Sequence, residues 1–216
     1  MARPTRPAIA RSAVATGRGD DGSTGLLFGG PRLLKDDLRV ETYGTLDEAV
    51  AALGLARAEL GLRAAAGDLP PTLTALDDLI LRLQRELFAV GGELATTPEH
   101  RDRAVDGISR VSEAMLEGLE AVLAEQETRM AMPREFVVPG ETRISAGLEV
   151  ARTTLRRAER RTVSLAGAGG LAPDSRVLPY LNRLSDLLWV LARVAEQGEA
   201  HAAVPSRPDR RRPRAR

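Results

Sequence analysis

The chain has 216 residues, 43% of them hydrophobic and 28% charged, which is typical of a soluble globular protein with one core. It contains no cysteine, so disulfides, thiolate metal sites and cysteine nucleophiles are excluded. The formal charge is +1, but arginines gather in residues 1–18 and 207–216 and leave an acidic body. We therefore expect no nucleic-acid partner. No apolar run approaches the ~18 residues of a membrane span, so no membrane partner is expected either.

Residues 1–15 are arginine-rich and contain no acidic residue, a composition shared by transit peptides and by flexible basic extensions. Both readings stay open for this segment. Arginine is strongly preferred over lysine and alanine is frequent, as in high-GC bacterial genes. This bias favours a cytoplasmic protein.

The first chemical signal is the glycine-rich segment, residues 16–37, which reads TGRGDDGSTGLLFGGPRLLKDD and contains Lys35, the only lysine of the chain. Glycines let a backbone approach a polyanion and aim its N–H groups at it, and nearby hydroxyls and carboxylates suit a metal ion that bridges phosphates. The G-x-G-x-x-G match at residues 17–22 is no dinucleotide fingerprint, because no strand precedes it and no βαβ unit follows. A triphosphate site and a flexible loop both remain open.

Helical periodicity follows this segment. We expect helices over about 40–66, 72–97, 105–130, 144–165 and 174–198, separated by glycine and proline, with a short extended piece at 135–138. In the third helix Ile108, Val111 and Met115 are expected to point inward. The pattern predicts an all-α, up-and-down five-helix bundle, followed by a disordered, arginine-rich tail at 200–216.

The fourth predicted helix carries Arg152, Arg156 and Arg160 four residues apart, so these side chains share one face. Such a face can bind an anion, or it can be a solvated surface paired by Glu159 and other acids. In the fifth helix Asn182 lies beside the core stripe, where its amide could bind a base or ribose or make a buried helix contact.

The start of the first predicted helix contains a candidate capping box, with Thr45 as the cap and Glu48 three residues later. Asp47, between them, has no such local role and could pair with one of the arginines.

Five segments together resemble the PduO-type ATP:cob(I)alamin adenosyltransferases. They are TGRGDDGSTGLL, LLKDDLRVETYGTLDEAVAALG, FVVPGE, ARTTLRRAERR and YLNRLSDLLWVLAR, in the family's order over about residues 16–195. The resemblance implies a catalytic domain at 16–199 and a homotrimer with active sites between neighbouring subunits. It also implies that ATP and cob(I)alamin are substrates, with Mg²⁺ as cofactor and no assigned metal ligands.

The resemblance implies a role for each matching residue. Arg156, Phe136, Asp47 and Arg152 would be the catalytic residues, with Phe136 against the lower face of cobalamin and Asp47 paired to Arg152 across the subunit interface. The residues implied to bind ATP are Thr16, Gly17, Arg18, Gly19, Thr24, Gly25, Lys35, Arg156, Arg157, Glu159, Arg160 and Asn182.

The implied reaction is attack of cob(I)alamin on C5′ of ATP with loss of triphosphate, which needs placement and cations but no general base. Electrons would come from a separate cobalamin reductase, and a mutase that uses the product is a further candidate partner. Two alternatives stay open: an ATP-binding cobalamin carrier or regulator on the same bundle, and a structural helical protein whose arginine tail binds acidic partners.

Overall fold

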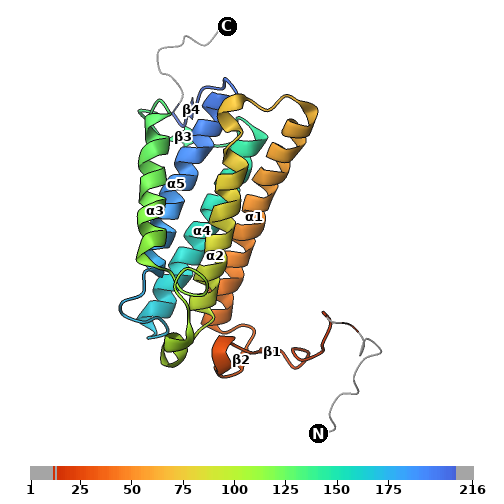
Figure 1. Cartoon of the computed structure of the whole chain (residues 1–216), viewed down its shortest axis with the longest axis vertical. Coiled ribbons are helices and arrows are strands. Elements are labelled where there is room, and N and C mark those ends of the chain that lie inside the picture. Colours follow the sequence, from red (N-terminus) through yellow and green to blue (C-terminus); the bar gives the residue numbers. More distant parts are fainter. Residues whose placement is uncertain (1–11, 13, 208–216) are drawn as a thin grey trace.

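The computed structural model describes residue 12 and residues 14–207, and within them five α-helices run side by side (Figure 1). They are α1 (Leu38–Ala66), α2 (Leu76–Leu94), α3 (Glu113–Thr128), α4 (Arg143–Gly167) and α5 (Val177–Gly198). Three short 3₁₀ helices, η1 (Leu27–Gly29), η2 (Pro71–Leu73) and η3 (Pro98–Arg103), lie in the connections. The prediction of an all-α helix bundle is confirmed.

Helix α4 is the centre of the bundle. It packs between α1 and α5, while α2 covers α1 and α3 covers α5. Its inward stripe follows the predicted helical spacing, since Leu148, Ala151, Leu155 and Ala158 are all fully buried. The core is almost entirely aliphatic, as the scarcity of aromatic residues requires.

The start of α1 differs from the predicted capping box. Asp37 caps the helix by accepting a hydrogen bond from the Arg39 backbone N–H at 2.8 Å. Thr45 lies two turns inside the helix, where its hydroxyl donates to the Glu41 carbonyl at 2.8 Å. The capping-box prediction is therefore wrong, because the helix already begins at Leu38.

The start of α3 also differs from the prediction. The chain turns at residues 105–110, where Gly107 has φ 76°, a left-handed conformation that favours glycine. Ser112 then caps α3 by accepting from the Met115 N–H at 3.2 Å. Val111 and Met115 are buried as expected, but Ile108 is 72% exposed, so its predicted inward position is wrong.

Two small antiparallel pairs mark opposite ends of the bundle (Figure 1). At one end β1 (Ser23–Thr24) pairs with β2 (Leu33–Leu34), and at the other β3 (Val137–Val138) pairs with β4 (Val204–Pro205). The strand β3 confirms the predicted extended piece. The strand β4 lies in the tail that we expected to be disordered, so residues 204–205 depart from that expectation.

The basic extension at residues 1–11 and 13 and the arginine-rich end at 208–216 lie outside the described residues. Within the described part of the chain, no helix combines the length and apolar character needed to cross a membrane.

Candidate functional site

The glycine-rich segment folds as a hairpin at the end of the bundle where α1 begins (Figure 1). Asp21 accepts hydrogen bonds from the Ser23 backbone N–H at 2.9 Å and from its hydroxyl at 2.7 Å, and these bonds lower the pKa of the Asp21 carboxyl. Arg32 donates to the Arg18 carbonyl at 2.7 Å. These bonds fold the turn that begins at Arg18, and the predicted phosphate-binding residues Thr16, Gly17 and Arg18 lie exposed at its start.

Lys35 lies directly against Gly19. The Lys35 backbone N–H donates to the Gly22 carbonyl at 2.9 Å, which returns the chain to the loop. A Cβ added at Gly19 would be 3.0 Å from the Lys35 Nζ and 3.2 Å from the Ser23 carbonyl oxygen, so a side chain there would push against the Lys35 ammonium. Among the described residues, Lys35 makes no ion pair. The only ammonium of the chain is thus available for an anion.

Tyr43 joins this hairpin to α1. Burial raises the pKa of the Tyr43 hydroxyl, and the negative charge of Asp47 adds to the rise, whereas the side chain of Thr24 opposes it. Asp47 lies one turn further along α1 at the surface, where partial desolvation raises its own pKa. No arginine, lysine or histidine within residues 12 and 14–207 forms an ion pair with Asp47.

The arginines of α4 divide between two sides of the helix. Arg157 and Arg161 point toward α1 and pair with Glu48 and Glu41 respectively. The predicted nucleotide ligand Arg157 is therefore engaged within the chain, and Glu48 serves this ion pair instead of the expected capping box. Arg160 is exposed at the surface.

Arg152 and Arg156 lie on the side of α4 that faces α5. The Arg156 Nη1 donates to the Glu159 Oε2 at 2.7 Å and approaches the Asn182 Oδ1 at 3.4 Å. The Arg152 Nε donates to the Glu149 Oε2 at 2.7 Å. The structure therefore brings together Arg156, Glu159 and Asn182, which are 26 residues apart at most, as the sequence predicted for one site.

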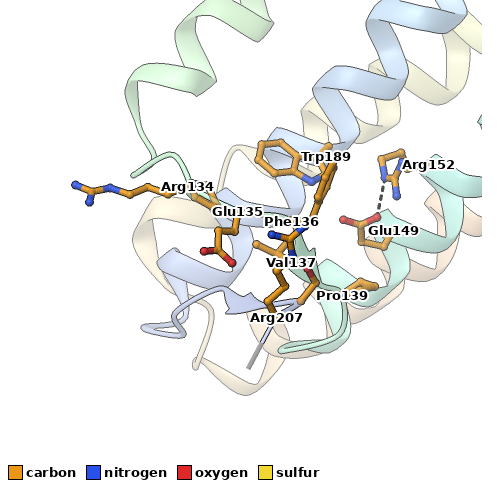
Figure 2. Close-up of a pocket in the computed structure, with 11 residues that line it drawn as sticks. Arg134, Glu135, Phe136, Val137, Pro139, Glu149, Arg152, Trp189 and Arg207 are labelled. Atoms are coloured by element: carbon orange, nitrogen blue, oxygen red, sulfur yellow. Dashed lines mark hydrogen bonds and ion pairs between the residues drawn. The ribbon is translucent and has the colours of Figure 1, made fainter. Parts of the chain in front are cut away.

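A cavity of about 660 Å³ begins at Arg152 and Glu149 and extends toward β3 and β4. Figure 2 shows the Arg152–Glu149 ion pair beside Phe136 and Trp189 at this cavity. Phe136 is 86% exposed, so its ring is free to contact a ligand. The full lining consists of Pro133, Arg134, Glu135, Phe136, Val137, Pro139, Glu149, Arg152, Trp189, Ser206 and Arg207.

The candidate residues thus form two groups. The first is the hairpin with Lys35 and Asp47 at the start of α1. The second, which we call the groove, follows the facing sides of α4 and α5 from Asn182 and Arg156 to the cavity at Phe136. Within the described residues, no hydrogen bond or ion pair joins the two groups. Within the described residues of one subunit the two groups are therefore not bonded to each other, and each is here called a half-site.

Sequence reasoning missed a buried charge cluster behind the cavity. Arg193 is fully buried and donates to both carboxylate oxygens of Glu196, at 2.8 and 2.7 Å, and to Glu149 Oε1 at 3.3 Å. Its guanidinium also lies 5.6 Å from the centre of the Trp189 ring. Glu149 therefore links the buried Arg193 to Arg152 at the cavity. The only signal in the sequence was a charged pair inside the apolar stripe of α5.

The described residues contain no group of three or more carboxylate or histidine side chains placed to hold a metal ion. Asp21, an acid of the hairpin, is already occupied by Ser23 and Arg32. These side chains do not fit a resident Mg²⁺ site.

Comparison with known proteins agrees with this geometry. A family model described as cobalamin adenosyltransferase matches residues 14–195. The chain is 37% identical to a corrinoid adenosyltransferase of Citrobacter freundii, covering 85% of this chain and 94% of that protein. It is 39% identical to one of Bacillus subtilis, covering 83% and 84%.

Solved structures give the same result. A variant PduO-type ATP:corrinoid adenosyltransferase from Lactobacillus reuteri, complexed with cobalamin and ATP, superposes with a TM-score of 0.74 at 28% identity, covering 89% of this chain and 98% of that chain. The family match spans both half-sites, from the glycine-rich hairpin to the end of the α5 stripe. The chain belongs to the PduO-type cobalamin adenosyltransferase family.

Proposed function

We propose that this protein transfers the 5′-deoxyadenosyl group of ATP to cob(I)alamin, giving adenosylcobalamin and triphosphate. The observation that carries the proposal is the side of α4 that faces α5, where Arg156 contacts Asn182 and Arg152, one turn away, lines a cavity bordered by Phe136. A nucleotide held at one end and a corrinoid at the other would place their reacting atoms between these residues. The family's curated enzymes, named corrinoid adenosyltransferases, support this assignment.

In the proposed reaction the cobalt electron pair forms the Co–C5′ bond, and the C5′–O bond breaks with its electron pair leaving on triphosphate. No proton moves in this step. The chain must therefore hold the two substrates in line and stabilise the charge that grows on the leaving group. Arg156 and Lys35 are the cations suited to that task, because both are exposed at their half-sites.

The proposed active site lies between neighbouring subunits of a homotrimer. Two observations support this arrangement: the half-sites are separate within one subunit, and Asp47 has no cationic partner among the described residues. Arg152 of a neighbouring subunit would supply that partner and compensate the desolvation of the Asp47 carboxylate. The remaining predicted ligands, Thr24, Gly25 and Arg160, would complete the nucleotide side.

Phe136 would serve the corrinoid. A bulky apolar side chain in the place of the lower axial ligand keeps cobalt four-coordinate, which makes reduction to Co(I) easier. The electrons would come from an external reductase. Since the described side chains do not fit a resident metal site, any Mg²⁺ would enter as part of the ATP substrate. The domain that carries out this chemistry is proposed to span residues 16–199.

The proposal is tested by mixing the purified protein with ATP and chemically reduced cobalamin and following adenosylcobalamin formation by absorbance. Arg156→Ala should lower kcat by about 10²–10³-fold, the usual loss for one group that stabilises transition-state charge. Arg161→Ala is the matched control, because Arg161 is an equally exposed arginine of α4 that pairs only with Glu41. Its turnover should equal that of the wild type.

The alternatives predict different results. A cobalamin carrier would bind ATP and corrinoid but form no product. A structural helical protein would show no ATP-dependent rise in melting temperature. Wild-type kinetics in Arg156→Ala would contradict the role assigned to that side chain.

A further inference from the structure

The chain does not leave the bundle at the end of α5. Ala200 has φ 62°, a left-handed conformation, and the His201 N–H donates to the Glu196 carbonyl at 2.8 Å. This turn sends residues 201–207 back across the end of the bundle toward β3 (Figure 1). The family match ends at residue 195, so this C-terminal segment, residues 200–207, lies beyond it.

The C-terminal segment is bonded to the backbone of Phe136 and of the two residues that follow it. Val204 and Pro205 pair with Val138 and Val137 in the β3–β4 ladder. The Ser206 N–H donates to the carbonyl of Phe136 itself, at 2.7 Å. These are main-chain bonds, so they fix the path of the Phe136 segment regardless of the side chains present.

The Phe136 ring has little else to hold it. It is 86% exposed, and in the described residues β3 has no strand partner other than β4. The nearest additional anchor is Gln197 near the end of α5, whose side-chain amide bonds both the N–H and the carbonyl of Ala131, at 2.9 and 3.0 Å. That anchor lies five residues before Phe136. Without β4, the aromatic side chain would sit on an unpaired extended segment with many accessible conformations.

We propose that the C-terminal segment, residues 200–207, is a positioning element for Phe136 and forms one wall of the corrinoid cavity. Ser206 and Arg207 line the same cavity as Phe136, which places the wall and the positioning contact in one strand. The segment acts on the corrinoid through Phe136 and leaves the nucleotide end of the groove untouched. This inference rests on the proposed function, since it assigns the cavity to a corrinoid.

The test compares two truncations of the full chain. Ending the chain at Glu199 removes β4, whereas ending it at Arg207 keeps β4 and removes only the arginine-rich end. We expect the shorter protein to raise KM for cob(I)alamin about tenfold, the scale of one or two lost hydrogen bonds. It should also lose most of the four-coordinate cob(II)alamin signal in electron paramagnetic resonance, while its Kd for ATP stays unchanged. The longer truncation product should match the wild type in all three measurements.

A point variant tests the same contact in the full-length chain, in case the shorter protein misfolds. Ser206→Pro removes the N–H that bonds the Phe136 carbonyl and leaves the rest of the chain in place. It should show the same rise in KM for cob(I)alamin and the same loss of signal, at a wild-type melting temperature.

The outcomes separate this inference from the proposed function. If the wild type forms no adenosylcobalamin, the proposed function fails. If the wild type is active and both Ser206→Pro and the chain ending at Glu199 keep its KM and four-coordinate signal, only the positioning role is overturned. The positioning role would also be overturned if the altered proteins lost ATP affinity as much as they lost affinity for cob(I)alamin, because the segment would then act on the whole fold.

Discussion

Replacing Arg193 by alanine tests the buried charge cluster behind the cavity. Arg193 is fully buried, and its two carboxylate partners are nearly so, with Glu196 1% and Glu149 7% exposed at their side chains. The variant removes the cation and leaves both carboxylates in the core. Glu196 loses both of its hydrogen bonds to the guanidinium, while Glu149 keeps its bond to Arg152.

Removing one partner of a buried ion pair typically costs about 3–5 kcal/mol, because the remaining charge stays desolvated. The lost stacking on Trp189 adds to this cost. The same substitution at Arg183 provides the comparison within α5, since Arg183 and its partner Glu120 are 42% and 49% exposed. Surface pairs of this kind contribute about 0.2–1 kcal/mol.

Urea unfolding followed by circular dichroism measures both effects, at one protein concentration because assembly also stabilises the fold. With a slope of about 3 kcal/mol per molar urea, Arg193→Ala should lower the midpoint by at least ~1 M. The Arg183→Ala midpoint should shift by no more than about 0.3 M. Equal midpoints in the two variants would refute the reasoning, since the buried cluster would then contribute no more than a surface pair.

Two further predictions concern the hairpin and the subunit interface. In Gly19→Ala the new Cβ would lie 3.0 Å from the Lys35 Nζ, so the ammonium must move and the KM for ATP should rise about tenfold. The control is Gly118→Ala, which should leave the KM for ATP unchanged because nothing lies within 4 Å of its new Cβ. Equal KM values in the two variants would contradict the placement of Lys35. Desolvation raises the pKa of Asp47 above 3.8 in the free subunit, and pairing with an arginine in the assembly would lower that pKa. Assembly should therefore release a proton, and it should become stronger as the pH rises through the raised pKa of the free subunit. Sedimentation at several pH values should show a weaker pH dependence of assembly for Asp47→Asn, and identical profiles would argue against the ion pair.

The bundle could be predicted because burial follows helical periodicity along most of the chain. Leu148 and Leu155 recur at the spacing of one helix face, and both are fully buried. The predicted inward position of Ile108 was wrong because an apolar residue in a turn has the same sequence signal as one in a helix. The prediction that Thr45 caps the first helix was wrong because several residues near the start of α1 can cap a helix, and Asp37 is the first of them along the chain.

The site could be predicted only in part. Arg156 and Asn182 were each visible as a polar residue beside an apolar stripe, and the structure brings them within 3.4 Å. Periodicity placed Arg152 and Arg156 on one face of α4, but it could not tell which helix packs beside each face, and the neighbouring α1 determines that Arg157 pairs with Glu48. In the Arg193 cluster, Arg193 and Glu149 are 44 residues apart, a separation over which a single sequence carries no pairing signal.

The β3–β4 pair could not be predicted from the sequence for another reason. Two-residue strands are too short to show alternation, and Pro205 weakens any strand signal further. The charge of the arginine-rich end also dominates the composition there. The contact that holds Phe136 was therefore masked by features typical of a disordered tail.

The central claim is that two half-sites from different subunits make one active site. Its most direct test is complementation between Lys35→Ala, which damages the hairpin half, and Arg156→Ala, which damages the groove half. Each variant alone should be nearly inactive. When their subunits are unfolded, mixed and refolded together, some interfaces will join an intact hairpin to an intact groove, and adenosyltransferase activity should return to a substantial fraction of the wild-type value. A mixture that stays as inactive as the separate variants, although mixed assemblies form, would contradict the account.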